Sequence, residues 1–198
     1  MWLRKSAGTF LRAIAAARVH GGSAWRIACC RLRDDGVLVG RNVHLARGVS
    51  LRCMDGGTMV LHDGVSIAEN SLVLVRGGRL EIGRGSSLGR GSVVCAMESV
   101  VIGDGCLMAE YVTVRDQDHL FAGHEGLRSG FATAAVRIGD RVWLGAKSTV
   151  TKGVEIGEGC VVGANAVVTR SLAENSLAAG CPARVLRILD RSIPKSVG

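Results

Sequence analysis

The stretch that decides the fold is IGDRVWLGAKSTVTKGVEIGEGCVVGANAVV, residues 138–168. Every sixth residue in it is aliphatic: Ile138, Leu144, Val150, Ile156, Val162 and Val168. A six-residue period indicates a short strand and a bend, with one large side chain pointing inward and a small neighbour that lets the chain turn. Three such units close a triangular coil, and stacked coils bury a continuous aliphatic core. The stretch therefore predicts a β-solenoid.

The same frame continues upstream in triplets. The further inward positions are Val39, Leu45, Leu51, Leu61, Ile67, Val73, Ile82, Leu88, Val94, Ile102, Met108 and Val114. Because each triplet makes one coil, we expect an all-β solenoid of about six coils over residues 37–183. Cys106 and Cys160 fall on small interior positions and are predicted to fill the core, whereas Cys95 is predicted to lie at the surface.

The composition agrees with a core built from aliphatic side chains. Of the 198 residues, 47% are hydrophobic but only 4% are aromatic, with 28 glycines and 2 prolines, which excludes disordered and collagen-like chains. The seven cysteines are an odd number without CxxC spacing, which indicates reduced thiols in the cytoplasm. The net charge of +8 comes from the two ends, since residues 37–183 are neutral.

The flanking segments carry the basic charge. Residues 1–36 have apolar side chains at roughly helical spacing and are predicted to form an N-terminal helical cap. Residues 184–198 are predicted to form a short C-terminal helix and tail. The apolar run Ala13–Ala17 is too short for a signal-peptide core, so we expect a cytoplasmic protein. The basic N-terminal segment is compatible with contact with the inner membrane surface or a glycan, or with a solvated cap.

One interruption of the repeat differs in kind. From Val114 to Ile138 the chain runs 24 residues instead of six, so residues 116–135 are predicted to project as a loop. Long excursions from a regular scaffold are where functional residues concentrate.

With these motifs in place, the sequence resembles the left-handed β-helix acyltransferases of the hexapeptide-repeat superfamily. It is similar to galactoside and maltose acetyltransferases and to polysaccharide O-acetyltransferases. The resemblance covers residues 37–187 and is most specific over residues 138–187. It implies the left hand of the helix, acetyl transfer from acetyl-CoA to a hydroxyl or amine, no metal requirement, and a homotrimer with its site between neighbouring coils.

The resemblance places His119 at the position of the catalytic histidine. Imidazole ordinarily titrates near neutrality, so it can take a proton from an alcohol. Asp116 and Asp118 are candidates to orient His119, to bind acceptor hydroxyls or to keep the loop soluble, and a carboxylate of another subunit or a backbone carbonyl remains an alternative. His124 follows His119 by five residues, a spacing that also occurs in the metal site of γ-class carbonic anhydrases. Their zinc site needs a third histidine from a preceding coil, and none lies between His62 and His119. We therefore do not expect this pair to bind a metal ion.

The family block also implies a coenzyme A site on the C-terminal coils. Small residues would let the pantetheine arm approach the backbone, and arginines suit the phosphates because their planar donors reach two oxygens. Arg170 stands where the family usually has lysine. The implied residues are Trp143, Gly145, Ala146, Gly163, Ala164, Thr169, Arg170, Arg184 and Arg187. For Trp143 the alternative is a surface plug, and for Arg187 a solvated charge.

The expected function is an acetyl-CoA-dependent O-acetyltransferase acting on a hydroxyl of a sugar or polysaccharide precursor. His119 would deprotonate the acceptor, which attacks the thioester directly. The alternatives are acetylation of an antibiotic or natural product, and a scaffold without catalysis. Only the charge favours nucleic-acid binding, and no known module for it is present.

Overall fold

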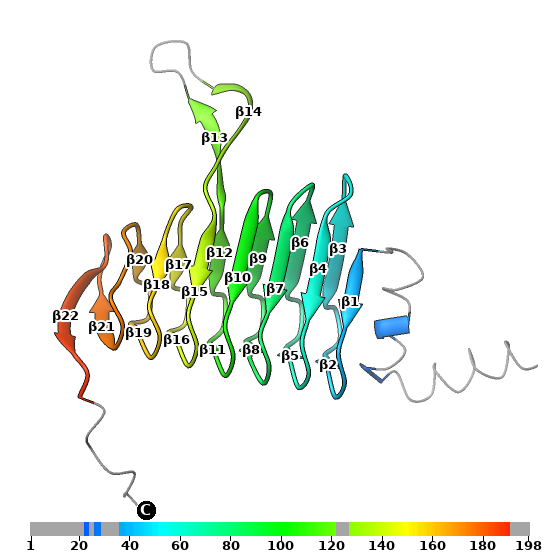
Figure 1. Cartoon of the computed structure of the whole chain (residues 1–198), viewed down its shortest axis with the longest axis horizontal. Coiled ribbons are helices and arrows are strands. Elements are labelled where there is room, and N and C mark those ends of the chain that lie inside the picture. The colour runs from blue at the N-terminus through cyan, green and yellow to red at the C-terminus, as the bar shows by residue number, and fades with distance from the viewer. Residues whose placement is uncertain (1–21, 24–25, 29–35, 122–126, 191–198) are drawn as a thin grey trace, which may run out of the picture.

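The protein is a triangular solenoid whose three sides are parallel β-sheets (Figure 1). The computed structural model describes residues 22–23, 26–28, 36–121 and 127–190. Sheet A contains β1 (Val37–Val39), β4 (Thr58–Leu61), β7 (Arg79–Ile82), β10 (Ser99–Ile102), β15 (Val136–Ile138) and β18 (Glu155–Ile156). Sheet C contains β3 (Ser50–Met54), β6 (Leu72–Arg76), β9 (Val93–Ala96), β12 (Thr113–Arg115), β17 (Thr149–Val150) and β20 (Val167–Val168).

Sheet B forms the third side and holds the C-terminal end of the described chain. Its strands are β2 (His44–Leu45), β5 (Ser66–Ile67), β8 (Ser87–Leu88), β11 (Leu107–Met108), β16 (Trp143–Leu144), β19 (Val161–Val162), β21 (Ser176–Ala179) and β22 (Arg184–Ile188). All neighbours in it are parallel except β21 and β22. The solenoid has about six turns and matches the left-handed parallel β-helix that the family resemblance implies.

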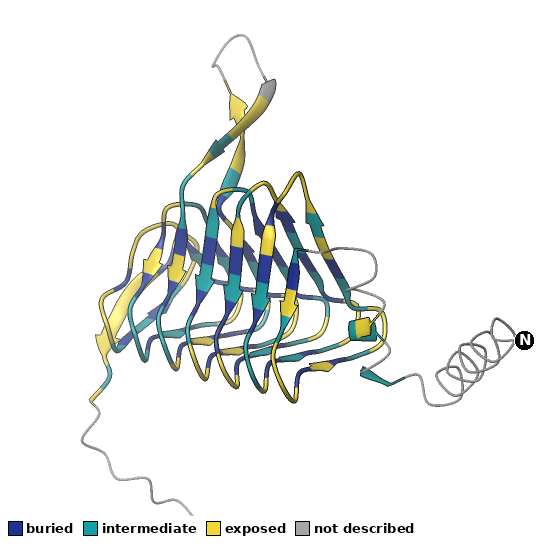
Figure 2. Ribbon diagram, turned by 45° about the vertical axis from the view of Figure 1, so that its right-hand side comes forward, coloured by how far each residue is buried: buried dark blue, intermediate teal, exposed yellow. Residues whose placement is uncertain are grey.

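The strand register stacks the six-residue repeat on itself. Leu61 pairs with Ile82, Ile82 with Ile102, and Ile102 with Ile138, so predicted inward residues form a column. All predicted inward residues except Val39 are buried, and Val39 packs partly buried against the same core. Figure 2 shows buried residues alternating with more exposed ones along the coils. The aliphatic core is therefore confirmed, including buried Cys106 and Cys160.

Between sheets B and C, one corner residue of each coil adopts a positive φ. Glycine tolerates this conformation freely, and asparagine does so better than most residues. From the second coil onward, the backbone amide of the corner residue bonds to the preceding coil, as when the Asn165 N–H donates to the Ala146 carbonyl at 2.9 Å. The corner residues, with φ between 58° and 76°, are Gly48, Asn70, Gly91, Tyr111, Lys147 and Asn165.

The C-terminal prediction was wrong in its secondary structure. Arg184–Ile188 form strand β22, which pairs antiparallel with β21, instead of a helix. The last parallel strand of sheet B would otherwise leave its edge hydrogen-bonding groups without a strand partner, and β22 supplies one. Residues 191–198 of the predicted tail lie outside the described part of the chain.

At the other end, a short helical piece covers the first strand of sheet B. Ser23 and Arg26–Ala28 are helical. The Ser23 hydroxyl donates to the Val43 carbonyl at 3.1 Å and accepts from the Leu45 N–H at 2.7 Å, while Arg26 Nε donates to the Leu45 carbonyl at 2.6 Å. The rest of the predicted cap at 1–36 lies largely outside the described residues. Among those described, no helix is long and apolar enough to cross a membrane.

The predicted loop 116–135 is a β-hairpin that stands away from the solenoid (Figures 1 and 2). Its strands are β13 (Gln117–Phe121) and β14 (Leu127–Thr133), which pair antiparallel. Asp116 at its base is fully buried. Its carboxylate accepts hydrogen bonds of 2.8–3.0 Å from the backbone N–H groups of Met97, Glu98 and Ser99. Asp116 thus fastens the hairpin to the corner between β9 and β10.

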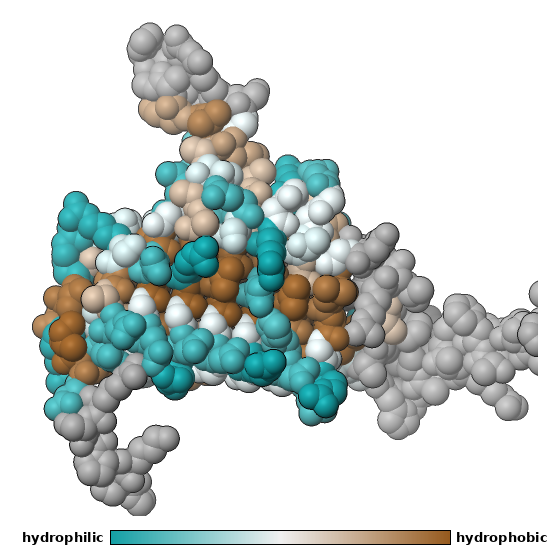
Figure 3. Space-filling model, viewed as in Figure 1, coloured by the Kyte–Doolittle hydropathy of each residue, from teal (hydrophilic) through white to brown (hydrophobic). Residues whose placement is uncertain are grey.

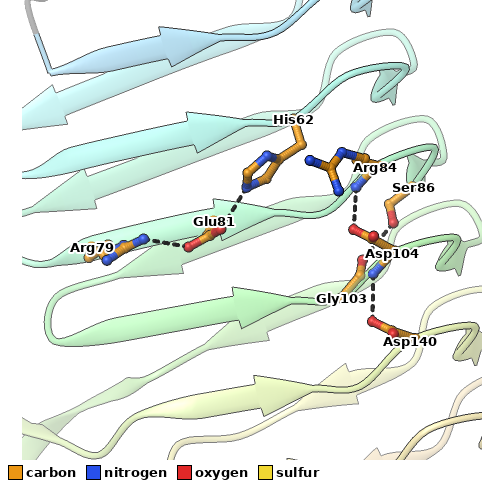
Figure 4. A network of polar contacts seen from close by, with 8 residues as sticks. All are labelled: His62, Arg79, Glu81, Arg84, Ser86, Gly103, Asp104 and Asp140. Atoms are coloured by element: carbon orange, nitrogen blue, oxygen red, sulfur yellow. Dashed lines mark hydrogen bonds and ion pairs between the residues drawn. The ribbon is translucent and has the colours of Figure 1, made fainter.

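Polar side chains connect neighbouring coils on the outside (Figure 4). Asp104 accepts the Arg84 N–H at 2.6 Å, and Asp140 accepts the Asp104 N–H at 2.9 Å. On sheet A, Glu81 contacts His62 Nε2 and an Arg79 amino group, both at 2.6 Å. The hydrogen bond with His62 is the main cause that lowers the pKa of Glu81, and burial opposes it.

Replacing Glu81 tests this network. Glu81→Gln should lower the free energy of unfolding by about 1 kcal/mol at pH 7, because the charge-assisted contacts are lost. The folded-state pKa is depressed, so the carboxylate stabilises the fold above its unfolded pKa of about 4.3 and the contribution disappears as pH falls through the folded value. Urea unfolding of variant and parent at several pH values should show the difference vanishing in acid. Glu155→Gln, on the same sheet, is the control.

Replacing Asp116 tests the anchor of the hairpin. Asp116→Ala leaves three N–H groups without their acceptor, so the free energy of unfolding should fall by about 3 kcal/mol or more. The matched control is Asp118→Ala, two residues away and exposed, which should cost less than about 1 kcal/mol. Equal losses in the two variants, measured by chemical denaturation, would contradict the anchoring role.

Candidate active site

A pocket of about 290 Å³ lies where the hairpin leaves sheet C. Strands β6 and β9 supply its floor, and β12 and the hairpin supply its wall. The residues that line it are Leu72, Leu74, Arg76, Cys95, Ala96, Met97, Arg115, Gln117, His119 and Phe131. The pocket therefore combines an apolar floor with two arginines and the predicted catalytic histidine.

Strand geometry explains why His119 lies in this pocket. Side chains alternate between the two faces of an extended chain, so residues two apart share a face. Arg115, Gln117 and His119 follow that alternation from β12 into β13, and all three line the pocket. His119 pairs across the hairpin with Phe131, and the two ring centroids lie 4.5 Å apart at an interplanar angle of 36°. The imidazole therefore lies against the Phe131 ring.

Neither predicted aspartate contacts the His119 ring. Asp116 is occupied by the backbone of the preceding coil, so its predicted role as an orienting or acceptor-binding group is not supported. Asp118 is adjacent in the strand and its carboxylate lies 3.6 Å from Lys152 Nζ. Among the described residues, none forms a hydrogen bond with the His119 ring.

Cys95 departs from its predicted surface position. It is only 4% exposed and lies in the floor of the pocket. Burial raises the pKa of the Cys95 thiol, and the Arg115 charge opposes this only in part. Because a thiolate and not a thiol is the nucleophile, Cys95 is poorly suited to carry an acyl group.

None of the residues predicted to bind coenzyme A lines this pocket. Trp143 is 49% exposed on sheet B, where the register Trp143–Val161–Leu177–Arg187 forms one outward row. Arg184 pairs with Ala179 at the end of the same sheet. Within one chain, these side chains and His119 therefore lie on two different sides of the solenoid.

The predicted small residues occupy the corners between sheets B and C. A Cβ at Gly145 would lie 2.6 Å from the Ala164 nitrogen, and one at Gly163 would lie 2.9 Å from Ala179 Cβ. Close stacking of coils is thus sufficient to require glycine there. Ala146 and Ala164 follow these glycines at the corners and are intermediate and exposed, respectively.

Thr169 and Arg170 lie on another edge. They follow β20 and are exposed, two coils beyond the point where the hairpin leaves β12. The predicted coenzyme A residues consequently divide between sheet B with its corner and the edge that carries the hairpin.

The pocket also contains residues that the sequence reasoning missed, namely Arg76, Arg115, Gln117 and Phe131. The alternation of Arg115, Gln117 and His119 was the available signal, because it continues the strand past Val114 into a segment interpreted as loop. Phe131 gave no such signal, since its pairing with His119 depends on the register of the hairpin. In the described part of the chain, no group of three His, Cys, Asp or Glu could hold a metal ion, and His124 lies outside it.

Comparison with known proteins agrees with this architecture. Residues 135–170 match the family model described as the hexapeptide repeat of succinyl-transferase. AntD, an N-acyltransferase from Bacillus cereus solved in complex with dTDP and 3-hydroxybutyryl-CoA, has a TM-score of 0.67 and 23% identity. That match covers 81% of this chain and 88% of the other.

Two curated relatives extend over most of the chain. The probable acetyltransferase Rv3034c of Mycobacterium tuberculosis is 30% identical over 169 residues, 82% of this chain, which spans only 55% of that relative's length. The putative lipopolysaccharide biosynthesis O-acetyl transferase WbbJ of Escherichia coli is 32% identical over 168 residues, 80% of this chain and 75% of the relative. With this coverage and a repeat-built solenoid, the chain belongs to the hexapeptide-repeat acetyltransferase family.

Proposed function

We propose that the protein transfers an acetyl group from acetyl-CoA to a hydroxyl group of a sugar or polysaccharide precursor. The observation that carries the proposal is the position of His119, in the wall of a pocket at the base of the projecting hairpin. The O-acetyltransferase name of its relative WbbJ supports a hydroxyl acceptor. The 3-hydroxybutyryl-CoA in the complex of AntD supports an acyl-CoA donor.

The chemistry needs one proton carrier at the acceptor oxygen. His119 takes the hydroxyl proton while the acceptor oxygen forms a bond to the thioester carbonyl carbon. Backbone N–H groups stabilise the negative charge on the carbonyl oxygen of the tetrahedral intermediate. The carbon–sulfur bond then breaks, the proton passes to the sulfur, and free coenzyme A and the acetyl ester leave. The raised pKa of Cys95 supports this direct route over an acyl-cysteine.

We propose further that the complete site forms between copies of the chain in a homotrimer. His119 faces a pocket on sheet C, whereas Trp143 and Arg187 face outward from sheet B. In a cyclic trimer, one face of each copy meets a different face of the next copy, so these two sides can meet in the assembly. Figure 3 shows hydrophobic side chains on the projecting hairpin, where Leu120 is 39% and Phe121 is 69% exposed. A neighbouring copy would cover them.

We also propose a cytoplasmic location, at or near the inner membrane surface. The free cysteines of the described chain, Cys53, Cys95, Cys106, Cys160 and Cys181, support a reducing compartment. The lipopolysaccharide-biosynthesis name of WbbJ supports a membrane-associated acceptor.

Removing the proposed base tests the mechanism. His119→Ala should lower kcat/KM for acetyl transfer by about 100-fold or more, because the acceptor proton has no carrier. Its affinity for coenzyme A, measured by calorimetry, should stay near that of the parent. His44→Ala, on an exposed position of the first coil, is the matched control. Transfer at the parent rate in His119→Ala would rule out the assigned role.

Complementation tests whether the site is shared between copies. His119→Ala and Trp143→Ala chains, each impaired alone, should regain activity when co-expressed, because a mixed trimer contains sites with both side chains intact. The expected recovery is several-fold above either variant, with the mixed species isolated through two different affinity tags. A mixed trimer no more active than the variants would rule out a site shared between copies.

A further inference from the structure

The lining of the pocket that contains His119 carries positive charge without acidic side chains to balance it. It contains Arg76 and Arg115 and no aspartate or glutamate. In the described part of the chain, Arg115 has no carboxylate within ion-pair distance, while Arg76 Nε lies 3.4 Å from Asp55 at the outer turn. The buried carboxylate of Asp116 is directed to three backbone N–H groups and does not line the pocket.

We propose that this pocket selects an acceptor sugar that carries an anionic group, a phosphate or a carboxylate, bound by Arg115 with Arg76 in the same lining. The proposal rests on the proposed acetyl transfer and adds the class of acceptor. Guanidinium groups bind such oxyanions through paired hydrogen bonds.

The positions along the strand suit a ligand of this kind. Arg115 and His119 are four residues apart on one face of a nearly continuous strand, so their Cα atoms are separated by at most about 13 Å. An anionic group at the guanidinium and a reacting hydroxyl at the imidazole are therefore about one substituted sugar ring apart, once both side chains reach inward. Gln117 lies between them in the same row.

The lining between the two ends suits a sugar ring. Leu72 and Leu74 form an apolar floor, and Phe131, 36% exposed, forms an aromatic wall. Gln117 Oε1 is buried and finds no hydrogen-bond partner among the residues that the structure describes. A hydroxyl group of an acceptor, or a small shift of the amide toward one, would supply the missing donor.

The register provides a matched control outside the pocket. Arg52, Leu74, Cys95 and Arg115 form one outward row across sheet C. Arg52 is exposed like Arg115 but does not line the pocket. Substitution of either arginine changes the net charge equally, so only a local contact distinguishes the two variants.

The test uses glucose, galactose, mannose and N-acetylglucosamine, each supplied as the neutral methyl glycoside and as the 1-phosphate, and the first three also as the uronic acid. Release of coenzyme A thiol gives kcat/KM for the full chain. We expect at least one anionic compound to exceed its neutral partner by about tenfold or more, as one charge-assisted contact allows. Arg115→Met should bring the ratio of kcat/KM between the anionic compound and its neutral partner close to one. Arg115→Lys should retain part of the preference, and Arg52→Met should leave it unchanged. Comparison of the sugar 1-phosphates with the uronic acids shows whether the pocket prefers a phosphate or a carboxylate.

Binding separates this proposal from the proposed function. Calorimetry of the same compounds with His119→Ala, which is designed not to turn them over, measures acceptor affinity alone. Binding of an anionic compound that is lost in His119→Ala/Arg115→Met supports the charge selection even if no transfer is detected. Transfer without any preference for anionic compounds overturns the charge selection and leaves acetyl transfer standing. Absence of both binding and transfer for every anionic compound also overturns it.

Discussion

The rest of the structure depends on the hydrogen-bonded stacking of one coil on the next. Parallel strands lie about 4.8 Å apart, so equivalent residues of successive coils stack on one another at that distance. Inside, the repeat aligns aliphatic residues such as Leu61, Ile82, Ile102 and Ile138 into a closed column. Each fully buried side chain of this kind contributes about 1.5–3 kcal/mol. At the corners, the same spacing leaves no room for a Cβ at Gly145.

This constraint concentrates chemistry where the repeat is interrupted. A uniform column of aliphatic residues offers no reactive group, whereas the hairpin between Val114 and Ile138 is free of the six-residue pattern. Asp116 connects the hairpin to the solenoid, because its carboxylate accepts hydrogen bonds from backbone N–H groups of the preceding coil. These bonds position the base of the hairpin. The strand alternation that starts at the base then carries Arg115, Gln117 and His119 along one face into the pocket. Asp116, which the sequence presents as a candidate partner of His119, therefore acts as the structural anchor of the hairpin.

Different parts of the site were accessible to sequence reasoning to different degrees. His119 could be singled out because it follows an inward residue at a spacing that the family block shares, and the structure places it in the wall of the pocket. The bonds of Asp116 could not be foreseen, because sequence proximity says nothing about a carboxylate that turns toward another coil. Gly145 and Gly163 were predicted to let the pantetheine arm of coenzyme A approach the backbone, although the close stacking of coils alone explains why glycine stands there. Arg115 and Phe131 were missed because one lay just before the presumed loop and the other required a hairpin register.

By itself, the sequence determined the solenoid, its six coils and its aliphatic core, because each of these follows from local periodicity repeated along the chain. It also located the excursion and the histidine within it. Only the tertiary structure decided that residues 184–188 form a strand, since the open edge of sheet B makes an extended partner favourable. Only the tertiary structure separated Trp143 from His119 onto different sides and brought Arg76 and Arg115 into one pocket, because contacts between coils depend on how many residues each corner contains.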